Sequence, residues 1–266
     1  MITLTSAQLN TWIAAFLWPL TRILGLIAAA PLFGNLSVPA TVKVVFGAML
    51  ALILAPVVPA LPATDPMSLV GLLILLQQLI IGLTMGFAMR VVFSTMEMAG
   101  EVVGLTMGFG FATFFDPQTH GRSSAISQFL ALLTLMLFLA TNVHLLMLST
   151  LADSFVTMPI SAAPVTGEAF RQIAAWGGLI FSAGLQLALP MIAVLLITNV
   201  ALGVLTRASP QLNLFGIGFP ITLGAGLVML ALAVPYIATP LGNLLQQGVD
   251  FTRQITTPSS AIAKPQ

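Results

Sequence analysis

The chain has 266 residues, of which 58% are hydrophobic and only 6% are charged. Soluble domains carry about 25% charged residues, because a surface that faces water needs polar groups. This composition excludes a soluble globular protein and predicts a surface that faces lipid or other subunits. The net charge of +1 indicates no nucleic-acid partner, and the absence of cysteine excludes disulfides and thiolate metal sites.

Apolar segments long enough to cross a bilayer recur along the whole chain, since one helical span needs about 20 such residues. The first is read as a retained helix, because no Lys or Arg precedes it as in a secretory signal. The sequence therefore predicts an all-α membrane protein of about six helices arranged as hairpins. The segments are Trp12–Ala30, Val42–Val58, Met67–Phe93 with a polar continuation to Gly104, Ala125–Leu148, Ile173–Leu205 and Leu214–Ile237.

Prolines interrupt the last two segments. Pro190 and Pro220 lie inside expected spans, and the sixth span is expected to end near Pro235 and Pro240. A proline within a helix removes one backbone hydrogen bond and bends the helix. Two interpretations stay open, namely simple kinks or helices packed inside an assembly whose protein neighbours satisfy the freed carbonyls.

Charged residues give a weak indication of topology. A loop carrying Asp153 and Glu168 is expected between the fourth and fifth segments, and a more polar tail is expected from Gly242 onward. More basic residues lie near the first, third and fifth connections than on the other side. Because basic loops stay cytoplasmic, this bias predicts that both termini lie outside.

Glycines recur at a four-residue spacing in the third segment and beyond it. Gly82 and Gly86 are followed by Gly100, Gly104 and Gly108. This spacing places glycines on one helical face, where the missing side chains let another backbone approach closely. Residues 100–108 are therefore predicted to form a close-packing surface.

A run of alternating Gly and Phe follows from Gly108 to Phe115. Such a run favours neither a helix nor a strand, so it predicts a loop with a flexible backbone and large apolar side chains. One interpretation is an interfacial loop whose rings lie among lipid headgroups. The other is a plug, in which apolar groups close a passage by excluding water.

Charged groups within the spans are the remaining candidates for a role in transport, because a charge at mid-bilayer costs at least about 2.5–3.5 kcal/mol. Glu97 and Glu101 share a helical face and either form a proton relay or lie at the polar end of the third helix, balanced by Arg90. Arg22 lies inside the first segment, where it is expected to reach an interface or to pair with a carboxylate of a neighbour.

No catalytic, cofactor-binding or metal-binding pattern is found. His120 and His144 lack the spacing of metal ligands, and no phosphate-binding loop or nucleophile elbow is present. The sequence therefore indicates no enzyme. A secondary transporter of a small solute is an alternative, although no convincing inverted repeat relates residues 1–133 to residues 134–266. A membrane-embedded enzyme would need a nucleophile and base, or a carboxylate cluster, within the spans.

Several stretches resemble the FliR family of flagellar export proteins, with the SctT group of virulence secretion as the nearest alternative. The most specific match is the run from Arg207-Ala208-Ser209-Pro210-Gln211 to Gly218-Phe219-Pro220. The other matches are Trp18-Pro19, Ala30-Pro31, Gly100-Glu101 with Gly104 to Gly108, Phe111-Ala112-Thr113-Phe114-Phe115-Asp116-Pro117 and Ala188-Leu189-Pro190. The similarity covers nearly the whole chain.

The resemblance implies a core subunit of the type III export gate in the bacterial inner membrane, at the base of the flagellum. One copy would join several copies of FliP-like and FliQ-like membrane subunits in a helical, funnel-shaped assembly through which unfolded flagellar proteins pass. FlhA-like and FlhB-like export components are further implied partners. Residues 1–150 would be the FliP-like helices and residues 173–240 a FliQ-like hairpin, whereas the tail at 242–266 matches no motif.

The resemblance also implies roles for single residues. The channel plug would contain Met107, Phe109, Phe111, Phe114 and Phe115. Tight subunit packing around it would use Gly100, Gly104 and Gly108. The hairpin tip near the cytoplasmic entrance would contain Arg207, Pro210, Gln211, Asn213, Gly218, Phe219 and Pro220.

Overall fold

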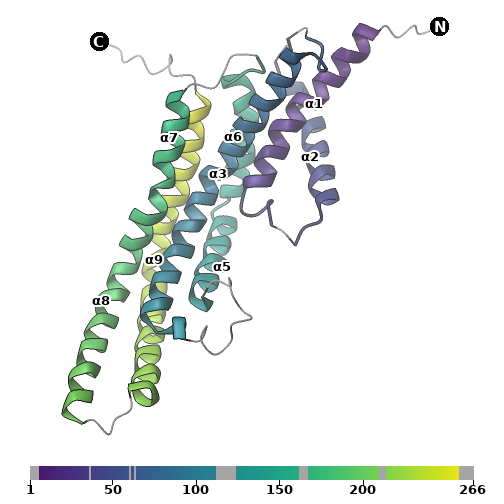
Figure 1. The fold of residues 1–266 in the computed structure, drawn as a ribbon. Helices are drawn as coiled ribbons and strands as arrows, with labels where there is room; N and C mark the ends of the chain where they lie inside the picture. Colours follow the sequence, from purple (N-terminus) through teal and green to yellow (C-terminus); the bar gives the residue numbers. More distant parts are fainter. Residues whose placement is uncertain are drawn as a thin grey trace, which may run out of the picture. The chain divides into compact units, whose positions relative to one another are not determined.

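A computed structural model describes residues 6–35, 37–59, 61–62, 64–111, 124–161, 167–209 and 214–257 (Figure 1). Within these ranges the secondary structure is helical and contains no strand. The longer helices are α1 (Ser6–Ala29), α2 (Ala40–Leu54), α3 (Leu69–Thr106), α5 (Ala125–Ala140), α6 (Val143–Thr157), α7 (Gly167–Gly177), α8 (Leu179–Ala208) and α9 (Phe219–Thr256). Short 3-10 turns cover Ala55–Val57 and Phe109–Phe111.

The helices have the length and composition of membrane spans. In the part of the chain that the structure describes, five are long and apolar enough to cross a bilayer, and the count is six if α5 and α6 form one broken span. The predicted all-α membrane protein is therefore confirmed. The polar continuation of the third segment is helical too, because α3 runs for 38 residues without interruption.

The fourth segment differs from the prediction because it is two helices. Asn142, between α5 and α6, has a φ of 57°, in the left-handed region. Asparagine tolerates this conformation better than most residues, so the local sequence favours a break here. The expected loop positions of Asp153 and Glu168 were wrong, since Asp153 lies in the last turns of α6 and Glu168 in the first turn of α7.

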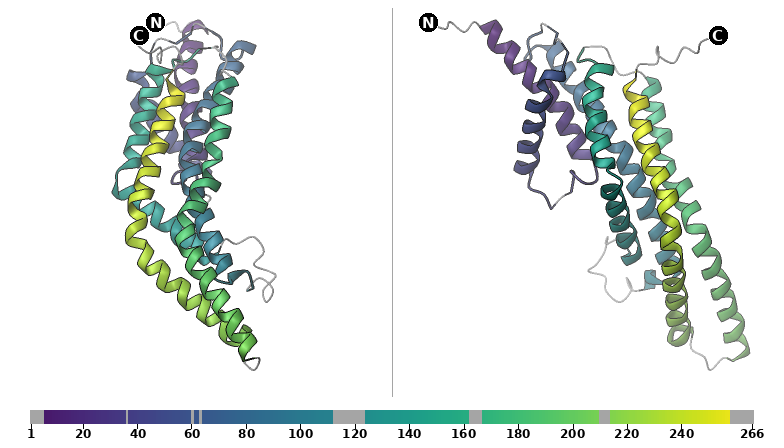
Figure 2. Two further views of the ribbon diagram at one scale, coloured as in Figure 1. Left: turned by 90° about the vertical axis from the view of Figure 1, so that its left-hand side faces the viewer. Right: turned by 180° about the vertical axis from the view of Figure 1, so that it is seen from behind.

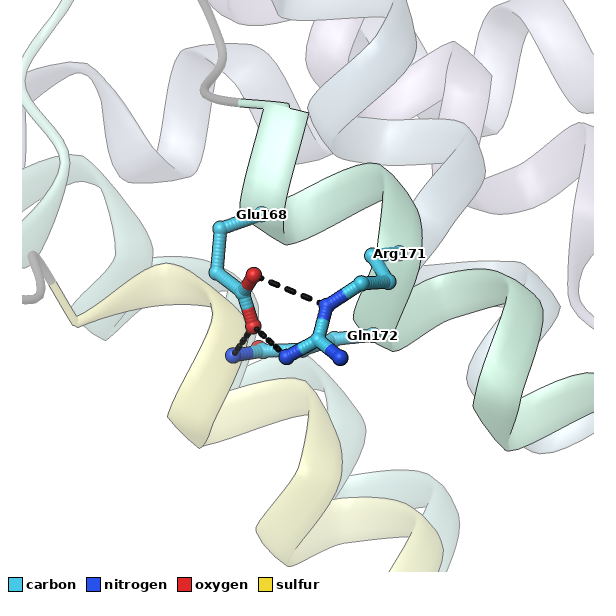
Figure 3. Close-up of polar contacts among 3 residues, drawn as sticks. All are labelled: Glu168, Arg171 and Gln172. Carbon is cyan, nitrogen blue, oxygen red and sulfur yellow. Dashed lines mark hydrogen bonds and ion pairs between the residues drawn. The ribbon is translucent and has the colours of Figure 1, made fainter.

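The fifth segment is also divided. α7 ends at Gly177 and α8 begins at Leu179, with Pro190 inside α8 as expected. Figure 3 shows Glu168, in the first turn of α7, accepting two hydrogen bonds of 2.9 Å from Arg171 and one of 3.3 Å from Gln172. An ion pair this exposed contributes little to stability, because water and salt screen it.

The sixth segment begins and ends differently from the prediction. Pro220 is the second residue of α9, where a missing amide hydrogen costs nothing, and a π-helical turn at Leu214–Gly218 precedes it. The helix continues through Pro235 and Pro240 to Thr256. The expected helix end near those prolines was therefore wrong, and the tail from Gly242 is helical as far as Thr256.

The chain divides into two compact units, each assembled from segments far apart in the sequence. The first contains residues 1–91, 142–176 and 245–266, and the second contains residues 92–141 and 177–244. The long helices α3 and α9 contribute residues to both units.

In the first unit, glycines bring α1 and α3 into backbone contact. A methyl group added at Gly25 would lie 2.8 Å from the carbonyl oxygen of Leu79, and one at Gly86 would lie 2.7 Å from that of Leu26. A methyl group at Gly82 would overlap the carbonyl oxygen of Arg22. Glycines on both helices thus permit an approach that any side chain would prevent.

Replacing Gly82 with alanine is expected to destabilise the first unit by about 1–3 kcal/mol, the usual cost of overpacking. The added methyl group meets backbone atoms, which cannot move aside as a flexible side chain does. The unfolding temperature in detergent measures the effect. Gly203→Ala on α8 is the control, because nothing lies within 4 Å of the added methyl group there, and an equal effect of both substitutions would contradict the prediction.

The second unit contains the last part of α3, α5, α8 and most of α9. Phe93 on α3 packs edge-on against Phe138 on α5, with ring centroids 5.6 Å apart. Both views in Figure 2 show α8 and α9 side by side. A cavity of about 420 Å³ lies between these two helices near Pro190 and Pro240.

Candidate functional site

The candidate site lies in the second unit, at the end of α3, where the sequence predicts close packing and a loop. Gly100 and Gly104 face the beginning of α5. A methyl group added at Gly100 would lie 2.5 Å from the Cα atom of Ser127, and one added at Gly104 would lie 2.7 Å from the hydroxyl of Ser124. In the structure Gly100 is approached by the backbone of this chain's own α5, and Gly104 by the side chain of the α5 N-cap residue.

Polar groups fix the same contact. The carboxylate of Glu101 accepts a 2.9 Å hydrogen bond from the backbone amide of Ser124, which is the N-cap of α5. The Ser127 hydroxyl donates a 2.9 Å hydrogen bond to the backbone carbonyl of Glu97. Neither Arg90 nor Glu97 forms an ion pair with another described residue. Glu101 thus helps to start α5, a structural role that the relay interpretation did not include.

The chain turns sharply where α3 ends. Gly108 follows the end of α3, so it does not share a helical face with Gly100 and Gly104 as the spacing predicted. It has a φ of 93°, which side-chain-bearing residues rarely adopt. Met107, one residue earlier, is wholly buried. A glycine is therefore required at the point where the chain leaves the helix and enters the Gly–Phe run.

Met107 packs against α9. A methyl group added at Gly226 would lie 2.5 Å from both Cγ and Cε of Met107 and 2.7 Å from its sulfur atom. Thr222, one helical turn earlier on α9, is also buried, and its hydroxyl lies 3.4 Å from the Met107 carbonyl oxygen as a hydrogen-bond donor. The same hydroxyl also lies within hydrogen-bonding distance of two carbonyls of its own helix. Met107 thus sits at the base of the loop, in contact with its own chain.

The predicted plug residues are only partly described. The backbone of Phe109–Phe111 forms a 3-10 turn, and the Phe109 side chain is half-buried. Phe114 and Phe115 lie outside the described residues. The plug assignment therefore stays a prediction.

The predicted hairpin-tip residues are likewise partly described. Arg207 is exposed in the last turn of α8, where a cation is favourable beside the helix carbonyls. Gly218 is buried, whereas Phe219 and Pro220 are exposed at the start of α9. Pro210, Gln211 and Asn213 lie outside the described residues.

Three residues of the site carry no distinctive sequence signal, namely Ser124, Thr222 and Gly226. A serine before an apolar run is a common N-cap, which is the only hint that the sequence offers for Ser124. Thr222 and Gly226 belong to the site only because the end of α3 packs against α9. No group of side chains suited to hold a metal ion occurs among the residues that the structure describes.

Comparison with known proteins gives a consistent family. Residues 13–248 match the family of bacterial export proteins, family 1. The chain is 43% identical over 261 residues to the flagellar biosynthetic protein FliR of Pectobacterium carotovorum subsp. carotovorum, covering 98% of this chain and 100% of that protein. It is 42% identical over 240 residues to FliR of Escherichia coli K12, covering 90% and 91% of the two chains.

A more distant relative agrees. The chain is 29% identical over 244 residues to FliR of Bacillus subtilis, covering 91% of this chain and 94% of that protein. The match to the family and the extent of these similarities confirm the resemblance seen in the sequence. The chain belongs to the FliR family of flagellar biosynthetic proteins.

Proposed function

We propose that this protein is a core subunit of the flagellar type III export gate and acts in the bacterial inner membrane, within the flagellar basal body. With FliP-like and FliQ-like subunits, one copy of the chain would form the channel through which unfolded flagellar proteins pass. FlhA-like and FlhB-like components would meet this channel. The observation that carries the proposal is the family membership over residues 13–248, in an apolar helical chain. Relatives named for flagellar biosynthesis favour this role over its virulence-secretion counterpart.

The exposed apolar side chains support a protein that is covered by lipid and by partner subunits. Contiguous apolar surfaces of this kind mark sites of protein or membrane contact. Helices α2 and α8 carry many of them, including Val42, Val45, Met49, Leu52, Ile53, Phe181, Leu185, Leu196, Ile197, Val200 and Val204. On this proposal residues 1–150 correspond to a FliP-like part and residues 173–240 to a FliQ-like hairpin.

The Gly–Phe loop is proposed as the plug of the closed channel. Its rings are uncharged and bulky, and a constriction lined by such groups excludes water and therefore ions. The turn at Gly108 and the close packing of α3 against α5 support a loop with a fixed starting point. Phe109, Phe111, Phe114 and Phe115 would provide the apolar closure.

Co-expression with partner subunits tests the proposal. When the chain is tagged and produced together with the FliP-like and FliQ-like proteins of the same organism, purification in mild detergent is expected to recover all three in one complex. Native mass spectrometry would give one copy of this chain per complex. A tagged, unrelated membrane protein of similar size serves as the control for co-purification. Recovery of this chain only as a monomer would contradict the proposed assembly.

A further inference from the structure

We infer that Met107 is a positioning residue that anchors the base of the Gly–Phe loop to α9 by packing its side chain against the backbone at Gly226. The inference rests on the proposed function and deepens it, because it names what holds the plug in place. Four observations of the second unit carry it: a buried side chain, a glycine that the side chain covers, a hydrogen bond from a threonine hydroxyl to the Met107 carbonyl, and a turn directly after Met107.

The contact between Met107 and Gly226 depends on the absence of a side chain at position 226. Met107 has no exposed surface, and three of its side-chain atoms occupy the volume that a Cβ atom at Gly226 would need. One of them is Cγ, close to the backbone, so a flexible side-chain end alone cannot clear the overlap. Displacing a fully buried side chain would also disturb its other neighbours, because protein interiors are close-packed.

Thr222, on the same helix as Gly226, adds a polar contact to Met107. Its hydroxyl reaches the Met107 carbonyl oxygen at 3.4 Å, a long and therefore weak hydrogen bond. The hydroxyl is satisfied by its own helix as well, at 3.2 Å and 3.0 Å from the carbonyls of Gly218 and Phe219. The shape of the contact with Gly226 is therefore the main determinant of position.

Gly108 separates the anchor from the loop. Its positive φ directs the chain away from α3 immediately after Met107. Since glycine has the widest range of allowed backbone angles, the chain can change direction at residue 108 while residue 107 stays in place. The arrangement thus combines a fixed point on α9 with a pivot directly after it.

A double-mutant cycle tests the anchor in the assembled complex. Gly226→Ala is expected to raise the ion conductance per complex several-fold, because the displaced Met107 no longer sets the start of the loop. Met107→Ala is expected to do the same, and the double variant should be no leakier than either single variant, since both changes disrupt one contact. Gly224→Ala is the matched control on the same helix, as nothing lies within 4 Å of its added methyl group.

A cross-linking measurement tests the contact without relying on activity. The chain contains no cysteine, so a pair can be introduced without background. Because Met107 Cγ lies 2.5 Å from the Cβ position of residue 226 and a carbon–carbon bond is about 1.5 Å long, the two β-carbons lie within about 4 Å, in the range of a disulfide. Oxidation is expected to cross-link M107C with G226C, but not M107C with G224C. The cross-linked protein should still export flagellar subunits, because the pivot lies beyond the anchor.

The possible outcomes separate the anchor from the gate itself. Absence of the cross-link, additive leaks in the cycle, or a loss of export on oxidation that a reductant restores would each overturn the anchor. A complex whose Phe109–Phe114 loop is deleted serves as the reference. If that reference leaks and Gly226→Ala does not, the anchor is wrong and the plug stands. If the reference does not leak, the plug itself is wrong.

Discussion

Replacing Arg22 with leucine is expected to destabilise the first unit by several kcal/mol, because it leaves more than one buried acceptor without a donor and each such group costs about 1–3 kcal/mol. Arg22 lies within α1 and has no exposed surface. Its guanidinium donates to the side-chain oxygen of Gln78 on α3 at 2.8 Å and to the backbone carbonyl of Ser154 on α6 at 2.7 Å. It also donates to the carbonyl of Met158 at 2.8 Å.

The geometry explains why the loss should be large. The Arg22 side chain connects α1 with α3 and α6 through hydrogen bonds. Its planar group also lies over the ring of Phe155, 4.5 Å from the centroid. Leucine would leave the amide oxygen of Gln78 and the carbonyl of Met158 without this donor, and each buried unsatisfied group costs about 1–3 kcal/mol. Lysine should restore only part of the stability, because a single ammonium cannot span acceptors that a guanidinium fork reaches.

Thermal unfolding in detergent measures this effect, together with the yield of folded protein from membranes. Arg90→Leu on α3 is the matched control, because that arginine is exposed. Adding Gln78→Leu to Arg22→Leu should recover part of the loss, since the orphaned amide is then absent as well. An Arg22→Leu protein as stable as the unmodified chain would show that the hydrogen bonds donated by Arg22 are dispensable for stability.

Deletion of Phe109–Phe114 is expected to convert the assembled complex from a closed channel into one that conducts ions and leaks small solutes. A constriction of apolar rings excludes water, so ions that need hydration cannot pass. The deletion removes the rings and therefore the barrier, but it leaves Met107 and its contact with Gly226 on α9 in place. Single-channel recording in a planar bilayer measures the conductance, and dye efflux from vesicles measures the leak.

Two triple variants that keep the length of the loop distinguish closure of the channel by apolar groups from closure by side chains that merely fill it. Replacing Phe109, Phe111 and Phe114 together with serine should also open the channel, because a polar lining admits water. Replacing the same three residues with leucine should leave it closed, because leucine keeps the constriction apolar. Unchanged conductance in both the deletion and the serine variant would rule out a plug at this loop.

The sequence was sufficient for the membrane class and for five of the six expected spans, since long apolar runs have few alternatives to a helix in lipid. The boundaries predicted for two of the spans were wrong, and each error has a physical reason. Asn142 broke the fourth span because a single left-handed residue interrupts an otherwise apolar run without changing its hydrophobicity. Pro235 and Pro240 did not end α9, because a membrane helix can continue through proline when neighbours or local adjustments satisfy the freed carbonyls.

The roles of single residues were predictable only in part. The spacing of Gly100 and Gly104 indicated close packing, but which segment approaches them depends on the path of the chain into α5. Arg22 was recognisable as a costly buried charge, and pairing with a carboxylate was one expectation. Within the described residues its partners are instead an amide, a hydroxyl and two backbone carbonyls, from segments more than 50 residues away in the sequence.

Composition and local pattern by themselves determined that this protein is a helical membrane protein, and the order of its motifs determined its family. Both properties depend on hydrophobicity and on neighbouring residues in the chain. Only the tertiary structure decided which glycine receives Met107 and which acceptors receive Arg22. These contacts join residues 107 and 226, and residues 22 and 154, whose proximity depends on how the helices cross rather than on any local preference.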